Sequence, residues 1–150
     1  MNRPGKHYTF LKMAEILAEQ ATCSRRQVGC ILTNVQGHII GSGYNGNAYG
    51  LDHCIDTPCT GATMRSGEGL DVCEAIHAEQ NALMQCRNIN EIYNVYVTTA
   101  PCMHCTKMLL NTPCRSVYYA NKYQGWEKCH ELFQASGRNF IHITLDEDGV

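Results

Sequence analysis

Strand-like and helix-like segments alternate through the second half of the chain. Short runs rich in β-branched and aromatic residues at 94–99, 116–120 and 140–145 are separated by two helical patterns, one opened by Pro101 and one at 125–136. This order predicts parallel strands, because each crossover helix returns the chain to the same end of the sheet. Helices then cover the sheet on both faces.

The first half of the chain adds a helix, a hairpin and a second helix. Residues 7–21 carry apolar side chains at helical spacing, and strands at 28–33 and 38–43 flank the short turn Asn-Val-Gln-Gly. A further helix is expected over 74–86. The order α-β-β-α-β-α-β-α-β predicts one domain over 1–150, a three-layer α/β/α sandwich with a five-stranded mixed sheet. The last residues, DEDGV, are expected to form a loose tail.

Composition limits the classes of function and the cellular location. The formal net charge of −2 argues against a nucleic-acid partner, and no apolar run is long enough to span a membrane. The start of the chain has no secretion-signal pattern, so we expect a cytoplasmic protein. Ten cysteines in such a chain are expected to bind metal or to stay free rather than to form disulfides.

Two short segments predict a catalytic zinc site. Cys102 and Cys105 lie three residues apart at the expected start of a helix, where the helix dipole favours thiolates, and Pro101 suits the first helical turn. His77 completes a set of three ligands. The fourth tetrahedral position then remains for water, which is the arrangement of a catalytic rather than a structural zinc.

Glu79 follows His77 by two residues, a spacing that needs an explanation. Positions i and i+2 of a regular helix point about 200° apart. Both residues can therefore serve one metal only if His77 lies at the irregular end of its helix. Glu79 is then expected to take protons from water that the metal activates and to pass them to the substrate. The water is expected to attack the amine-bearing carbon of a pyrimidine.

The combination of His-x-Glu with Pro-Cys-x-x-Cys is the signature of the zinc nucleobase deaminases. A structural zinc site, or a core histidine with buried thiols, would leave Pro101 and Glu79 unexplained. The segments CSRRQVG, GYNGNAYGLDHC, CEAIHAEQNAL and APCMHC resemble those of the deoxycytidylate deaminases, including the bacterial late-competence and phage members. The resemblance extends from about residue 8 to residue 145.

The resemblance implies the cytidine-deaminase-like sandwich and conversion of dCMP to dUMP and ammonia, which supplies thymidylate synthesis. It also implies a homo-oligomer, often a hexamer, activated by dCTP and inhibited by dTTP. It assigns His77, Cys102 and Cys105 to the catalytic zinc and Glu79 to proton transfer. Asn45 matches the asparagine expected to contact the sugar, although Asn-Gly is also a common turn pair.

Three other residues are candidates for binding the substrate. Arg25 and Arg26 are candidates for the 5′-phosphate, because guanidinium groups match phosphate oxygens; a solvated basic pair is the alternative. Tyr123 follows a strand end, where α/β sites collect, and is expected either to line the pocket or to pack. Ala48 stands where the family usually has proline, and alanine allows this segment more conformational freedom. The segment expected to bind the regulatory nucleotide comprises Gly43, Tyr44, Asn45 and Gly46.

The long segment 44–72 has no period and far exceeds the usual loop of about 4–6 residues, so we expect it to be functional or stapled. A second, structural zinc would pin this segment to the body of the domain. Members resembling this chain hold such a zinc with varying ligands, and His53 could replace one thiolate. The candidate ligands are Cys23, Cys54, Cys59 and Cys73. Scattered buried thiols are the alternative, and Cys30, Cys86, Cys114 and Cys129 are expected in the core.

Three further functions stay open. A deaminase could act on another cytosine compound, such as cytidine, dCTP or a 5-modified dCMP. A tRNA adenosine deaminase shares the zinc motifs, but the net charge of −2 and the GYNG segment argue against it. A non-catalytic zinc module would not need the carboxylate of Glu79.

Overall fold

The computed structural model describes residues 2–65, 68–69 and 72–145, so the predicted tail DEDGV lies outside the described residues. The elements follow the predicted order along the chain. They are α1 (Lys6–Ala18), β1 (Gly29–Thr33), β2 (Ile39–Tyr44), α2 (Ala78–Gln85), the short 3₁₀ helix η1 (Ile89–Glu91), β3 (Asn94–Thr99), α3 (Met103–Leu110), β4 (Ser116–Asn121), α4 (Trp126–Ala135) and β5 (Asn139–His142).

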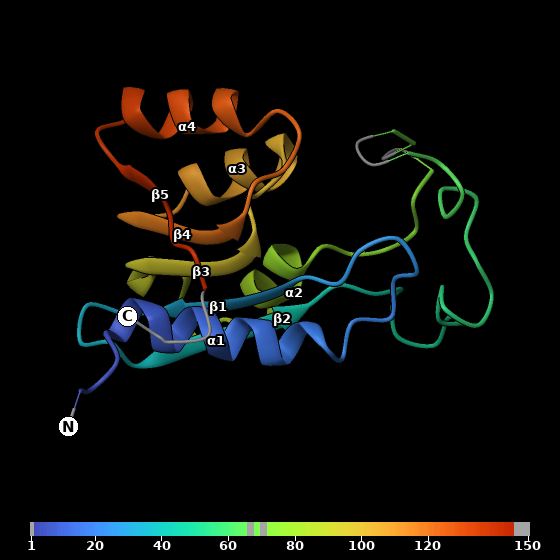
Figure 1. Ribbon diagram of the computed structural model, residues 1–150, viewed down its shortest axis with the longest axis horizontal. Helices are drawn as coiled ribbons and strands as arrows, with labels where there is room; N and C mark the ends of the chain where they lie inside the picture. Colours follow the sequence, from blue (N-terminus) through green and yellow to red (C-terminus); the bar gives the residue numbers. More distant parts are fainter. Residues whose placement is uncertain (1, 66–67, 70–71, 146–150) are drawn as a thin grey trace.

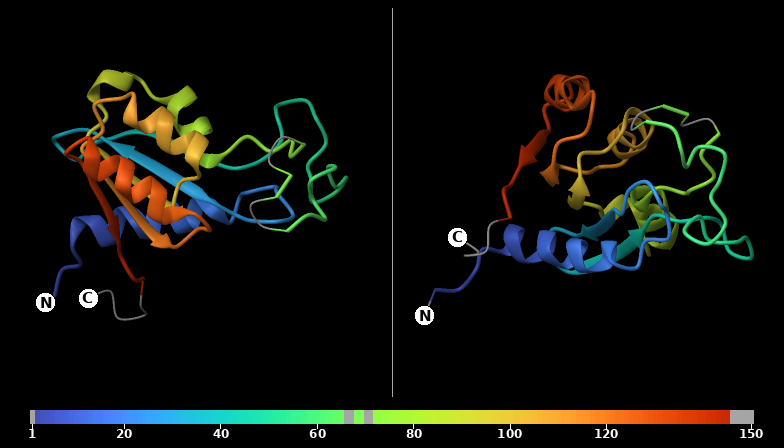
Figure 2. Two further views of the ribbon diagram at one scale, coloured as in Figure 1. Left: turned by 90° about the horizontal axis from the view of Figure 1, so that it is seen from above. Right: turned by 45° about the vertical axis from the view of Figure 1, so that its right-hand side comes forward.

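The strands form one mixed sheet in the order β2-β1-β3-β4-β5. β1 is antiparallel to β2 and β3, whereas β3, β4 and β5 are parallel. Helix α1 covers one face, and α2, α3 and α4 cover the other (Figures 1 and 2). The predicted three-layer α/β/α sandwich is therefore confirmed.

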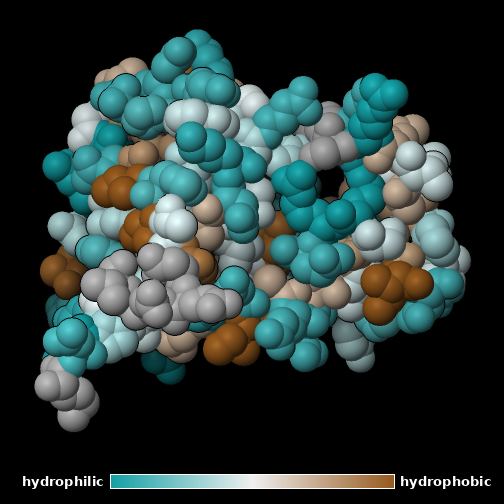
Figure 3. All heavy atoms as spheres, viewed as in Figure 1, coloured by the Kyte–Doolittle hydropathy of each residue, from teal (hydrophilic) through white to brown (hydrophobic). Residues whose placement is uncertain are grey.

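Alternating side chains explain how one sheet fills two cores. Ile31, Tyr96 and Tyr118 pack against α1, while their neighbours along the same strands pack against the other three helices. Successive residues of a strand point to opposite faces, so a strand covered on both sides is apolar throughout. The face of the molecule in Figure 3 is mostly hydrophilic, and its hydrophobic residues lie in small separate groups.

Helix α2 begins later than the sequence pattern indicates. We expected a helix from residue 74, but the chain stays extended until His77 because Ile76 pairs with Gly46. The Ile76 amide donates to the Gly46 carbonyl at 2.8 Å, and the Gly46 amide donates to the Ile76 carbonyl at 3.1 Å. This pairing brings together the two ends of the long connection between β2 and α2, which extends to the right of the sheet in Figure 1.

Four smaller predictions were also wrong. Helix α1 ends at Ala18 rather than at residue 21, because the amides of residues 19–21 bond to carbonyls three residues back. Strand β5 ends at His142 rather than at residue 145. Pro101 precedes the N-cap of α3 instead of lying in its first turn. Cys86 is partly exposed, whereas Cys30, Cys114 and Cys129 are buried in the core as predicted.

Candidate active site

His77 lies at the irregular start of a helix, as its spacing to Glu79 requires. It is the N-cap of α2, with extended backbone angles of φ −71° and ψ 153°. Its amide donates to the side-chain oxygen of Gln80 at 2.8 Å, which fixes the first turn. The helical turn begins only after His77, so its ring and the Glu79 carboxyl can face one point.

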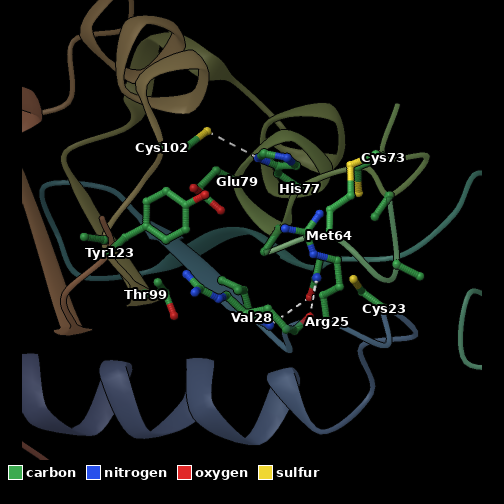
Figure 4. Close-up of a pocket in the computed structure, with 16 residues that line it drawn as sticks. Cys23, Arg25, Val28, Met64, Cys73, His77, Glu79, Thr99, Cys102 and Tyr123 are labelled. Atoms are coloured by element: carbon green, nitrogen blue, oxygen red, sulfur yellow. Dashed lines mark hydrogen bonds between the residues drawn. The ribbon is translucent and has the colours of Figure 1, made fainter. Parts of the chain in front are cut away.

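His77, Cys102 and Cys105, here called the metal triad, converge at the start of two helices. Cys102 is the N-cap of α3 and Cys105 lies in the first turn. Nδ1 of His77 is 3.5 Å from the Cys102 sulfur (Figure 4) and 3.3 Å from the Cys105 sulfur. Zinc bonds of about 2.3 Å to sulfur and 2.0 Å to nitrogen, at a tetrahedral angle, separate these atoms by about 3.5 Å. The distances therefore fit a zinc ion.

The three side chains of the metal triad differ in how strongly they hold a proton. Hydrogen bonding from the Cys105 thiol lowers the pKa of Cys102 to about 4, and His77 adds to this effect. The negative Cys102 in turn raises the pKa of Cys105 and of His77. A thiolate, a thiol and an imidazole within hydrogen-bonding distance form a donor set that a zinc ion can bind with release of protons.

Glu79 lies beside the metal triad and is almost completely buried, with 4% of its surface exposed. Burial raises the pKa of its carboxyl above the usual value. In the part of the chain that the structure describes, the group of three or more donor atoms that all lie within 4.8 Å of one another is the metal triad, and it does not include Glu79. Figure 4 shows its carboxylate facing the pocket between His77 and Tyr123. Glu79 thus lies beside the metal triad with its carboxylate toward the pocket, and it is not one of the three grouped donors.

A pocket of about 330 Å³ opens in front of Glu79. All four residues predicted to bind substrate line it, namely Asn45, Arg25, Arg26 and Tyr123. Several other residues that line the pocket were not predicted from the sequence. Among them are Val28, Ala62, Met64 and Thr99. Thr99 ends β3, and the carboxyl end of a parallel strand was the one signal that could have indicated it.

Asn45 fastens the end of β2 to the segment before β1. Its side-chain oxygen accepts the Val28 amide at 2.8 Å, and its side-chain nitrogen donates to the Arg26 carbonyl at 2.7 Å. The residue is 7% exposed. These contacts hold Asn45 at the pocket wall and show that it also has a structural role.

The two arginines lie in different surroundings. The Arg26 guanidinium lies over the Tyr123 ring, 4.5 Å from its centroid. The Arg25 guanidinium instead donates to the backbone carbonyls of Arg65 and Glu68. Arg26 therefore forms a cation–π pair inside the pocket, whereas Arg25 is bound to the long connection.

The predicted regulatory segment has packing roles. A Cβ atom on Gly43 would lie 2.5 Å from the Ala82 amide nitrogen, so a glycine is needed where α2 crosses β2. A Cβ on Gly46 would overlap the Thr22 hydroxyl. The Tyr44 side chain is 41% exposed. Packing alone accounts for both glycines, and nothing in these contacts tests a regulatory role.

Four further cysteines, here called the loop cysteines, lie on segments that connect helices and strands. They are Cys23, Cys54, Cys59 and Cys73. The sulfurs of Cys54 and Cys59 are 3.7 Å apart. Burial raises the pKa of Cys73, and the thiols of Cys59 and Cys23 add to this. Among the described residues, no three of the loop cysteines have donor atoms that all lie within 4.8 Å of one another. Burial opposes ionisation of Cys54, but the Ser24 hydroxyl and Cys59 lower its pKa to about 7. His53 is exposed.

Residues 4–121 match the family described as the cytidine and deoxycytidylate deaminase zinc-binding region. The chain belongs to this deaminase family. ComE operon protein 2 of Bacillus subtilis is 33% identical over 151 residues, which cover 98% of this chain and 76% of that protein. The deoxycytidylate deaminase of Schizosaccharomyces pombe is 32% identical over 153 residues, and the chain covers 99% of its own length but 47% of that enzyme's.

Solved deaminase structures share the fold. The dCMP deaminase of cyanophage S-TIM5, in complex with dCMP and dUMP, superposes with a TM-score of 0.72 at 25% identity, over 95% of this chain and 100% of the phage chain. The deaminase fold and the zinc-binding motifs thus agree with the geometry of the metal triad and Glu79.

Proposed function

We propose that this deaminase catalyses the hydrolysis of dCMP to dUMP and ammonia, and so supplies dUMP for thymidylate synthesis. The observation that carries the proposal is the Glu79 carboxyl beside three zinc-binding donors, at the floor of a pocket of about 330 Å³. The yeast relative named deoxycytidylate deaminase and the phage enzyme solved with dCMP and dUMP support the choice of substrate.

The metal triad would hold zinc, which lowers the pKa of a bound water to about 7 and so supplies a nucleophile at neutral pH. Glu79 accepts a proton from that water and donates it to the ring nitrogen beside the amine-bearing carbon. The water oxygen bonds to that carbon, and Glu79 takes the remaining proton from the new hydroxyl and passes it to the amino group. The carbon–nitrogen bond then breaks, which releases ammonia and leaves the carbonyl of dUMP. A buried carboxyl with a raised pKa suits this work, because it takes up a proton more readily than an exposed carboxyl does and can then return it.

The remaining pocket residues would orient the nucleotide. We assign Arg26 to the 5′-phosphate and the second N–H of the Asn45 side chain to the sugar. Tyr123 packs on Arg26 at 4.5 Å and so holds its guanidinium at the pocket wall. Arg25 is a second phosphate candidate, but its guanidinium already bonds to two carbonyls.

A second, structural zinc at the loop cysteines is part of the same proposal. The distance of 3.7 Å between the Cys54 and Cys59 sulfurs supports it, and the thiols of Cys23 and Cys73 would complete the ligand set. Four thiolates are a common ligand set for structural zinc. His53 is the alternative to one of them.

We also propose a cytoplasmic homohexamer regulated by dCTP and dTTP at residues 43–46. All ten cysteines lie within the described residues and are free thiols, which suits a reducing compartment. No helix of the described residues is long and apolar enough to cross a bilayer. The exposed Tyr44 gives the proposed regulatory segment one side chain at the surface for a nucleotide base.

A substrate panel tests the proposed function. Ammonia release is measured with dCMP, CMP, cytidine and dCTP, and the Glu79→Gln variant serves as the background for each. We expect dCMP to be among the best substrates. Preference for another cytosine compound would reject dCMP but keep the deaminase, whereas no release from any compound would reject deamination of cytosine.

A further inference from the structure

The neighbouring arginines of the pocket have different partners. Arg26 contacts the ring of Tyr123, but the Arg25 guanidinium bridges two backbone carbonyls of the long connection, with 3.1 Å from Nη1 to the Glu68 oxygen and a second bond to Arg65. A guanidinium is a rigid fork of donors and can hold two acceptors at a fixed separation. Arg25 therefore ties a segment about 40 residues away to the start of β1.

The segment that Arg25 holds is also part of the pocket wall. Ala62 and Met64, immediately before Arg65, line the pocket together with Arg25 itself. In Figure 4 Met64 and Arg25 lie on one side of the pocket and Tyr123 on the other, with Glu79 and His77 between them at the top. The position of Met64 thus depends on how firmly Arg65 and Glu68 are held.

A glycine supports Met64 from the other side. Gly69 has φ +63°, and a Cβ atom at this position would overlap the Met64 sulfur. Because Gly69 has no side chain, the Met64 thioether can occupy this space. A methionine offers an adaptable apolar surface, which suits a base or a sugar face better than a phosphate.

We propose that Arg25 is a positioning residue that, through the carbonyls of Arg65 and Glu68, keeps Met64 against the pocket and so completes the wall that recognises the nucleoside part of the substrate. The choice of a pyrimidine nucleotide as ligand rests on the proposed function. Arg25 then acts on the nucleoside part of the substrate, whereas the 5′-phosphate is assigned to Arg26.

Binding of dUMP and of deoxyuridine, which lacks the phosphate, distinguishes the two roles. Calorimetry on the zinc-loaded protein should show that Arg25→Gln weakens both ligands by the same factor, about tenfold, because the nucleoside wall is loosened. Arg26→Gln should weaken dUMP alone. Lys12→Gln removes an equal charge from an exposed ion pair on α1 and should change neither. Selective loss of dUMP binding in Arg25→Gln would make Arg25 a phosphate ligand and overturn the proposal, as would unchanged binding of both ligands.

A double-mutant cycle with Met64→Ala tests whether Arg25 acts through Met64. The Arg25→Gln change should cost much less affinity in the Met64→Ala background than in the wild type, and additive losses would contradict the proposal. With dCMP as substrate, Arg25→Gln should raise KM and leave kcat within about twofold, since Arg25 does not act on the reacting atoms. Arg25→Lys should recover part of the loss.

Two glycines provide a test that leaves Arg25 intact. Gly69→Ala should displace Met64 and weaken both ligands alike. Gly50→Ala is the matched control, because Gly50 has φ +89° but open space around a Cβ atom. Equal effects of the two variants would overturn the proposal. Deamination of dCMP by the wild type is a separate readout of the proposed function, and a wild type that binds neither ligand would reject both ideas.

Discussion

The metal triad and the loop cysteines offer similar ligands on very different supports. The metal triad lies at the starts of α2 and α3, two helices that pack on the sheet, and its donor atoms are already within 4.8 Å of one another. The loop cysteines lie on connecting segments, with 3.7 Å between the Cys54 and Cys59 sulfurs, and no three of them among the described residues have donor atoms all within 4.8 Å of one another. Helix ends on a sheet can preorganise a site before the ion binds, whereas a loop depends on its ion for order.

The largest effect should come from breaking the preorganised region. Cys102→Ser should abolish the binding of the catalytic zinc and lower dCMP turnover by about 10³-fold or more. The fold should persist, because serine is a favourable N-cap for α3. Elemental analysis, turnover and the melting temperature check this. A Cys102→Ser protein with wild-type zinc content and turnover would contradict the assignment.

The loop cysteines should show the opposite pattern, a large effect on order and a smaller one on chemistry. Cys59→Ser should lower the zinc content from two ions per chain to one and reduce the melting temperature by several degrees, with about a tenfold loss of turnover at most. Cys86→Ser, at a partly exposed cysteine outside both sets, is the control. One zinc per chain in the wild type would rule out the loop site.

The smallest effect should come from His53. Its side chain is exposed, and we assign the loop zinc to four thiolates rather than to three thiolates and an imidazole. His53→Ala should therefore leave two zinc ions per chain and an unchanged melting temperature. Loss of one zinc in this variant would show that His53 replaces a cysteine as a ligand. The loop zinc would then be held by three thiolates and an imidazole.

The same contrast explains what the sequence could predict. The order of strands and helices, the two-faced sheet and the metal triad all follow from local spacing, and the separation of His77 from Glu79 correctly required His77 to lie at a helix end. Side chains on regular elements have directions that the period fixes.

Contacts between distant segments were beyond the sequence analysis. The pairing of Ile76 with Gly46 shortens α2, and no local sequence pattern indicates this pairing. The bonds from Arg25 to Arg65 and Glu68 turn a predicted phosphate ligand toward the long connection. Such contacts depend on how a loop without a period folds back, which neither propensity nor spacing determines.

The Glu79→Gln variant is the sharpest test of whether Glu79 transfers the protons of the reaction. Zinc content and dCMP turnover are measured on one sample beside the wild type. Glutamine keeps the size of the buried side chain but cannot carry the proton. We expect the Glu79→Gln protein to hold as much zinc as the wild type and to lose turnover by about 10³- to 10⁴-fold. Turnover near that of the wild type, in a variant with full zinc content, would contradict it.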